Sequence, residues 1–357
     1  MRILHVCQFL GIGGLEQVLF LLAQEQIALG HEVHLVVYDH DQRWVEKFQK
    51  ANIRVMTQIK KKKGIDLSML DQFENIIGDY DIVHTHDLNP GFYFALLKFR
   101  MKIQGKKLSF IHTTHGMEHL KLDPKTFIFE ALLGIMADKI LTVSPKFQNF
   151  YQAQFFTKSS KVELIENGTK VPAETRFPKP QKLIDDLNLN PEQPIALYIA
   201  RVVPLKGQLE LIQKYKDLDH QLLLVGPSGD QKYFNQCKEN LSSNIKMLGS
   251  RADINDLIDL CDYYVSHSFH EGLPISVLEA GARNKPCLLL SIPGHIQFNK
   301  ESHCVDLFQE NEFKDKLETL PEISSKLSTN FRILIEKKYS SNAMTEKVMS
   351  CYREVIC

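Results

Sequence analysis

The sequence lacks several features that would place the protein in a specialised class. Its 357 residues contain no apolar run of the ~20 residues needed to cross a bilayer. Residues 1–6 lead directly into a strand pattern, so we do not expect a signal peptide. Lys+Arg and Asp+Glu both number 43, so no net charge indicates a nucleic-acid partner. The seven scattered cysteines form no C-x-x-C pair, which argues against disulfides or zinc and favours a cytoplasmic protein.

The length and apolar content of the chain predict two globular domains. Hydrophobic residues make up 44% of the sequence, within the globular range, and a chain of this length usually forms more than one domain. Prolines and charges interrupt the apolar periodicity between residues 171 and 194. The expected organisation is therefore a domain over 1–170, a linker over 171–194, a domain over 195–340 and a final helix over 341–357.

In the first half, apolar strands alternate with helical patterns, which is typical of an α/β domain. A strand over Ile3–Cys7 is followed by a loop with Gly13 and Gly14, and then by a helix over Leu15–Leu29. This unit is characteristic of doubly wound sheets. The loop is not G-x-G-x-x-G, so the sequence does not favour nicotinamide binding.

Histidines stand at the ends of two later strands of this half. His84 and His86 share one face of a strand over 81–86, and His115 directly follows a strand over 108–114. Strand carboxyl ends are where open α/β sheets bind ligands. Two histidines could bind a metal, but no neighbouring residues in the sequence complete a ligand set, so we expect no metal site.

The most informative stretch of the second half runs from Ser266 to Ala282. Glu271 and Glu279 bracket a short turn and the start of a helix, and Pro274 suits the first helical position. A glycine turn before a helix start offers free N–H groups and a positive dipole end, which favour an anion. The two carboxylates cannot lie side by side on one helical face, so they should contact different parts of one ligand.

A pair of cations follows the strand expected over 195–200. Arg201 and Lys206 precede Gly207 and a helix over 208–215. The planar fork of arginine and the mobile ammonium of lysine suit a diphosphate. Gly226 ends the next strand, expected over 221–225.

The run E-G-L-P-x3-L-E-A, which begins at Glu271, resembles the signature of the retaining GT-B glycosyltransferases of glycosyltransferase family 4. The R-x4-K-G run from Arg201 and the G-G-x-E loop from Gly13 are similar to other motifs of that family, in the expected order. The resemblance covers about residues 1–300. It implies a GT-B fold with two Rossmann-like doubly wound domains facing a central cleft, the first on the acceptor side and the second on the donor side. The last helix, Asn342 to Val355, would cross back to the first domain.

The resemblance also implies an activity: metal-independent, retaining transfer of a hexose from a nucleotide-diphosphate sugar, without a cofactor. By this resemblance Glu279 binds the ribose, Glu271 the sugar, and Arg201 and Lys206 the diphosphate, while His115 lies at the sugar. Together His115, Glu271, Arg201 and Lys206 form the expected catalytic set. The remaining expected donor-binding residues are Gly13, Gly14, Gly226, Gly272, Leu273 and Pro274.

The family's usual acceptors are glycans or lipid-linked glycans, and its usual work is bacterial cell-surface polysaccharide or lipopolysaccharide synthesis. Two basic segments, Lys60–Lys63 and Phe92–Lys107, bear on where this chain would act. An amphipathic basic helix can bind the inner membrane face. A solvated helix face explains the second segment equally well.

Two alternatives to the transferase remain open from the sequence. One is a nucleotide-sugar 2-epimerase-like enzyme on the same fold, and the other is a non-catalytic partner subunit. The second is supported by residues 283–307, where Arg283-Asn284-Lys285-Pro286 and Pro293-Gly294-His295 depart from the family pattern. The sequence does not identify the donor base, the sugar or the acceptor.

Overall fold

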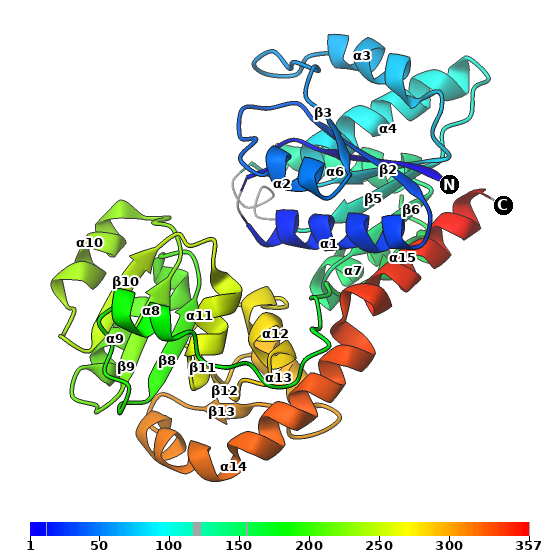
Figure 1. Ribbon diagram of the computed structural model, residues 1–357. Helices are drawn as coiled ribbons and strands as arrows, with labels where there is room; N and C mark the ends of the chain where they lie inside the picture. Colours follow the sequence, from blue (N-terminus) through cyan, green and yellow to red (C-terminus); the bar gives the residue numbers. More distant parts are fainter. Residues whose placement is uncertain (12, 117–122, 155, 357) are drawn as a thin grey trace. The chain divides into compact units, whose positions relative to one another are not determined.

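The computed structural model describes residues 1–11, 13–116, 123–154 and 156–356. The chain folds into two compact units, which Figure 1 colours along the sequence. The first unit comprises residues 1–168 together with 341–357, and the second comprises residues 169–340. The acceptor and donor roles expected for the two domains stay predictions.

The first unit is built on a parallel sheet with the strand order β3-β2-β1-β4-β5-β6-β7. Its strands are almost entirely buried, as expected for a parallel sheet covered on both faces. The strands are β1 (Arg2–Cys7), β2 (Glu32–Val37), β3 (Arg54–Met56), β4 (Ile82–His86), β5 (Phe110–Thr114), β6 (Lys139–Thr142) and β7 (Val162–Leu164).

Helices cover both faces of this sheet. Figure 1 shows α1 on one face and α3 and α4 on the other, and the last helix, α15, packs beside α1. The helices are α1 (Gly14–Ala28), α2 (Val45–Lys50), α3 (Ser68–Ile77), α4 (Leu88–Ile103), α6 (Phe127–Met136), α7 (Pro145–Gln152) and α15 (Ser341–Ile356). Short 3-10 turns are η1 (Pro124–Thr126) and η2 (Ser159–Lys161).

The second unit has a parallel sheet of its own, in the order β10-β9-β8-β11-β12-β13. The strands are β8 (Ile195–Ile199), β9 (Gln221–Val225), β10 (Ile245–Gly249), β11 (Tyr263–Ser266), β12 (Cys287–Leu290) and β13 (Asp306–Phe308). The helices are α8 (Gln181–Asp186), α9 (Gln208–Tyr215), α10 (Gln231–Glu239), α11 (Ile254–Leu260), α12 (Ile275–Ala282), α13 (Pro293–Ile296) and α14 (Phe313–Leu334). Single turns follow or precede them: η3 (Pro204–Lys206), η4 (Gln297–Asn299) and η5 (Ile335–Tyr339).

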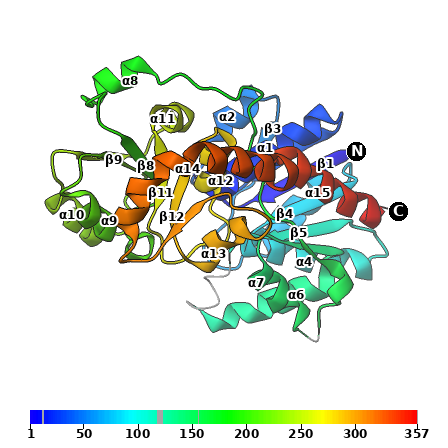
Figure 2. The ribbon, with the colours of Figure 1, turned by 90° about the horizontal axis from the view of Figure 1, so that it is seen from below.

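Residues 171–194, expected as a plain linker, are instead built into the second unit. They contain α8, and the buried Arg332 of α14 holds their first part. Its guanidinium donates to the carbonyls of Pro172 (2.5 Å) and Glu174 (2.9 Å), and also to that of Ala282 (2.8 Å). Figure 2 shows α14 running past α12, against which it packs. A single arginine therefore joins the segment, α12 and α14.

The strand orders confirm the α/β class and place the sites. In each sheet the strand order reverses beside the first strand, because β1 lies between β2 and β4, and β8 lies between β9 and β11. Crevices at such switch points, outside the carboxyl ends of the strands, are where open α/β sheets bind ligands. None of the described helices is both long enough and apolar enough to span a bilayer.

Candidate active site

The expected cation and carboxylate of the second unit meet at its switch point. Lys206 follows β8 and Glu271 follows β11, and the ammonium Nζ lies 2.5 Å from the carboxylate Oε1. Their side chains are 21% and 15% exposed, so the pair is accessible at one side. The ammonium has three donors and Glu271 engages one of them, so others remain for a phosphate oxygen.

Gly207 explains why the motif needs a glycine directly after the lysine. Its φ of 62° lies in the left-handed region, and it caps α9. A Cβ at this position would lie 2.4 Å from the carbonyl oxygen of His267. A second contact joins the same two segments, because the amide of Phe269 donates to the carbonyl of Leu205 at 3.0 Å. These contacts hold the turn that contains Lys206 against residues 267–269, which lead to Glu271.

Arg201 lies on the same edge of the sheet, at the end of β8. Its guanidinium is exposed, and within the described residues no hydrogen bond or ion pair engages it. Gly226 lies beneath the Arg201 backbone, because a Cβ there would meet the Ala200 carbonyl oxygen at 2.0 Å. Gly229 lies against the Arg201 side chain: a Cβ there would be 2.6 Å from Cδ. Both glycines let the loop after β9 approach the cation.

Helix α12 presents the second expected carboxylate. The helix starts at Ile275, so Pro274 is the N-cap residue and not, as predicted, the first helical residue. Ser276 fixes the helix start, since its hydroxyl donates to the carbonyl of Ile199 at 3.1 Å and accepts from Tyr264 at 2.8 Å. Glu279, half-buried, lies one turn later on the face of Ser276. The hydrogen bonds of Ser276 therefore hold the start of α12 at the end of β8, shortly before Arg201.

Residues 283–307, which depart from the family pattern, contain a glycine where the backbone of Glu271 needs one. Gly294 of α13 packs against it, and a Cβ there would lie 2.5 Å from the Glu271 carbonyl oxygen. The carbonyl of Gly272 accepts from Gln297 at 2.7 Å. His295 is fully buried and donates from Nδ1 to the carbonyl of Leu290 at 2.7 Å; burial lowers its pKa. Although these residues depart from the family pattern, they therefore support the turn that carries Glu271.

Asp253 orders the turn that follows β10. It occupies the N-cap position of α11. Its carboxylate makes no capping hydrogen bond, however, because Oδ1 accepts from Arg251 Nε at 2.8 Å. The aspartate thus orders the turn after β10 through an ion pair.

In the first unit the expected glycine loop precedes α1. Gly13 is the N-cap residue with an extended backbone, and Gly14 is the first helical residue. Glu16 folds back over this loop and accepts from the amide of Gly11 at 3.1 Å. A Cβ on Gly13 would lie 2.7 Å from the Glu16 carboxylate, so the glycine makes room for that contact.

Histidines occupy the switch point of the first unit. One of them, His5, was not predicted as a site residue from the sequence. His5 on β1 joins His84 and His86 on β4, and ligand atoms of all three lie within 4.8 Å of one another. The sequence alone did not bring His5 to this pair, because β1 and β4 pair only in the folded sheet. The expected absence of a metal site stays a prediction. Both ring nitrogens of each histidine already take part in hydrogen bonds. A metal would have to displace those bonds.

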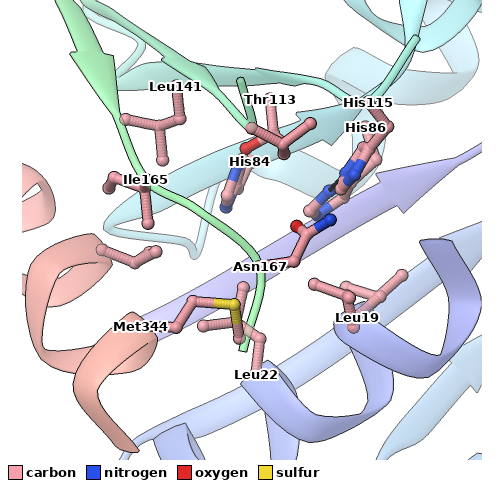
Figure 3. Close-up of a pocket in the computed structure, with 13 residues that line it drawn as sticks. Leu19, Leu22, His84, His86, Thr113, His115, Leu141, Ile165, Asn167 and Met344 are labelled. Atoms are coloured by element: carbon pink, nitrogen blue, oxygen red, sulfur yellow. Dashed lines mark hydrogen bonds between the residues drawn. The ribbon is translucent and has the colours of Figure 1, made fainter. Parts of the chain in front are cut away.

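A small cavity opens beside these histidines. Figure 3 shows His84, His86 and His115 together at one side of it and Asn167 close by, with apolar side chains of α1 and α15 opposite. Its volume is ≈ 20 Å³, which is room for about one water and not for a sugar.

The second basic segment is largely neutralised by the protein itself. On α4, Arg100 pairs with Asp71 at 2.6 Å and with Glu74 at 3.0 Å, and Lys98 pairs with Asp138. Lys106 also pairs with Glu74. This arrangement favours the solvated-face interpretation for Phe92–Lys107. Lys60–Lys63, by contrast, form an exposed or half-exposed loop before α3.

Comparisons with known proteins agree with this geometry. The family model described as Glycosyltransferase Family 4 matches residues 12–171, and the model described as Glycosyl transferases group 1 matches residues 180–333. The chain belongs to glycosyltransferase family 4. It is therefore a glycosyltransferase, and members of this family retain the anomeric configuration of the donor.

Individual relatives are distant. The chain is 24% identical over 277 residues to the UDP-Gal:alpha-D-GlcNAc-diphosphoundecaprenol alpha-1,3-galactosyltransferase of Escherichia coli, covering 72% of this chain and 67% of that one. It is 25% identical to the capsular polysaccharide biosynthesis glycosyltransferase CapH of Staphylococcus aureus, covering 73% and 71%. The crystal structure of Anabaena Alr3699/HepE in complex with UDP and glucose superimposes with a TM-score of 0.83 at 17% identity, covering 99% and 100%. The last comparison shows the GT-B fold.

Proposed function

We propose that this family 4 enzyme transfers a hexose from a UDP-sugar to a lipid-diphosphate-linked glycan, in the assembly of a bacterial surface polysaccharide. The observation that carries the proposal is the meeting of Lys206 and Glu271 beside Arg201 at a sheet switch point. The relative named for GlcNAc-diphosphoundecaprenol, the relative named for capsular polysaccharide biosynthesis, and the neighbour in complex with UDP and glucose support it.

The proposed roles follow from the chemistry of each group. Arg201 and Lys206 bind the diphosphate and stabilise the charge on its terminal oxygen as the bond from the sugar C1 breaks. The acceptor hydroxyl oxygen bonds to C1 on the same face, and its proton passes to the departing phosphate oxygen. Glu279 holds the ribose, Glu271 orients the sugar, and His115 is assigned to a sugar hydroxyl. No protein nucleophile or cofactor enters this scheme.

The test is transfer to a defined acceptor. Purified protein is incubated with radiolabelled UDP-glucose, UDP-galactose, UDP-GlcNAc and UDP-GalNAc, with and without GlcNAc-diphosphoundecaprenol. We expect label in the lipid fraction only with acceptor, and a product whose anomeric configuration equals that of the donor. Conversion of the donor to its 2-epimer without acceptor would replace the proposal with the epimerase. Absence of turnover with every donor would favour the non-catalytic partner.

We also propose that the first unit contacts the inner membrane surface through Lys60–Lys63. The adjoining side chains of Ile65 and Leu67 are 62% and 60% exposed, so an apolar contact lies beside the cationic loop. About 1 kcal/mol per lysine is expected near anionic lipid. Flotation with phosphatidylcholine vesicles containing 30% phosphatidylglycerol should recover the protein at low salt. Replacing the four lysines by glutamine should abolish recovery, whereas replacing the exposed Lys182 and Lys216 should not. Equal recovery with neutral vesicles would contradict the proposal.

A further inference from the structure

Seven buried or half-buried polar side chains of the first unit are joined end to end by hydrogen bonds. We call this set the histidine chain; its members, in order, are His115, His86, His5, Gln26, Tyr352, His84 and Thr113. They come from β4, β5 and its end, β1, α1 and α15, so the chain links the carboxyl edge of the sheet to the last helix. The interior members are no more than 2% exposed.

The amide of Gln26 sets the direction of the first branch. Its oxygen lies 2.8 Å from His5 Nε2, and because an amide oxygen only accepts, His5 carries its proton on Nε2. His5 Nδ1 must then accept, which places the proton of His86 on Nε2, 3.0 Å away. His86 Nδ1 in turn accepts from His115 Nε2 at 3.1 Å.

The second branch runs on from the amide nitrogen of Gln26. This nitrogen donates to the hydroxyl of Tyr352 at 3.3 Å, and the tyrosine proton then points to His84 Nδ1 at 2.6 Å. His84 keeps its own proton on Nε2 and donates to Thr113 Oγ1 at 2.6 Å. Every bond of both branches is thus made with one donor and one acceptor, and every ring is neutral.

We propose that this chain fixes His115 as the tautomer protonated on Nε2, leaving Nδ1 as an acceptor for a sugar hydroxyl, and that Gln26 and Tyr352 are positioning residues for it. A neutral imidazole that donates from Nε2 has its lone pair on Nδ1. Among the described residues, none bonds to that nitrogen. The identity of the ligand rests on the proposed function; the tautomer does not.

The chain also disfavours metal binding by the three clustered histidines. A metal ligand must offer a lone pair, but each lone pair of His5, His84 and His86 already accepts a proton from a neighbour in the chain. Burial adds to this, since desolvation lowers the pKa of His5 and of His115 to about 4 and keeps both rings neutral near pH 7.

The direct test is the tautomer itself. Protein labelled with ¹⁵N-histidine is examined at pH 8 by long-range ¹H–¹⁵N correlation, with the signals of His115 identified by their loss in His115→Asn. We expect Nε2 of His115 to be protonated and Nδ1 unprotonated, whether or not the enzyme transfers sugar. Protonation on Nδ1 would reverse the chain and overturn the proposal. So would stoichiometric binding of added Zn²⁺ that perturbs the signals of His5 and His84.

Two tyrosine variants separate positioning from general packing. Tyr352→Phe frees the Gln26 amide to turn over, so His115 should become a mixture of tautomers. If the proposed transfer is found, kcat should fall about tenfold. Tyr151→Phe is the matched control, because Tyr151 is equally buried in the same unit but bonds to Thr114 and Glu130, outside the chain. It should leave the His115 tautomer unchanged. A single unchanged tautomer in folded Tyr352→Phe would contradict the role of Tyr352.

Discussion

The six strands of the second sheet follow the same order as β3 to β6 of the first, but the two sheets place opposite chemistry at their switch points. Beside β1 the first unit gathers histidines that are buried, hydrogen-bonded and neutral. Beside β8 the second unit places Arg201, Lys206 and Glu271, which are charged and partly exposed. The backbone therefore decides where a ligand can bind, whereas the side chains decide which part of it each unit can hold. Charges suit a diphosphate, and neutral donors and acceptors suit hydroxyl groups.

The largest expected effect comes from removing the charge of the second switch point. Lys206→Ala should lower kcat about 100-fold, because it removes one cation from the leaving diphosphate and leaves Glu271 without its partner. Initial rates of transfer at saturating donor measure this. Lys216→Ala, an exposed lysine of the same unit, serves as the control. Equal rates in wild type and Lys206→Ala would show that the charge at this switch point does not act in the reaction.

A second prediction concerns the backbone that carries the charge. Gly207→Ala should destabilise the second unit by roughly 2–3 kcal/mol, because the new Cβ would meet the His267 carbonyl at 2.4 Å in a left-handed residue. Gly249→Ala is the matched control: its φ is 66°, but nothing lies within 4 Å of the new Cβ. It should cost only about 1 kcal/mol. Urea unfolding followed by circular dichroism compares them, and equal losses would exclude the clash as the cause.

A third prediction tests the neutral character of the first switch point through pH. Burial lowers the pKa of His5 to about 4 from the usual 6.5, so between these values the unfolded chain binds protons that the native chain does not. The stability of the first unit should therefore be complete above pH 6.5 and decline as the pH falls towards 4, by about 1.4 kcal/mol per pH unit and group.

Trp44, the single tryptophan, lies in the first unit and reports its unfolding in urea. The urea concentration at the unfolding midpoint should decrease as the pH is lowered from 7.5 to 5. His40→Gln, which removes an exposed histidine of the same unit, should give the same decline. A midpoint independent of pH would mean that the native chain binds protons as readily as the unfolded chain, so that burial does not keep these rings neutral.

The sequence predicted the features that are local in the chain. The helix expected over Gln208–Tyr215 and the strand over Gln221–Val225 have those same bounds, because apolar periodicity and flanking glycines define both. Lys206 and Glu271 were placed in one site by resemblance, and the structure brings them into contact. Their roles towards the donor stay predictions.

The sequence could not predict features that depend on contacts between distant residues. His5 looked like one residue of a buried strand, and only the pairing of β1 with β4 brings it to His86. Tyr352 lies 268 positions from its partner His84, so no spacing rule connects the two. The same limit applies to Gly294, whose contact with Glu271 forms only when α13 packs on that turn.

We propose that the second unit holds a nucleotide-diphosphate sugar through Arg201, Lys206, Glu271 and Glu279. The most direct measurement is the thermal shift of the purified protein with UDP-, GDP-, ADP- and TDP-sugars, in wild type, Lys206→Ala, Glu279→Ala and the control Lys216→Ala. A ligand at 100 times its dissociation constant adds about 2.7 kcal/mol of stability. We expect the UDP-sugars to stabilise wild type and control, and this stabilisation to be lost in the other two variants. No shift with any sugar nucleotide, or equal shifts in all four proteins, would contradict it.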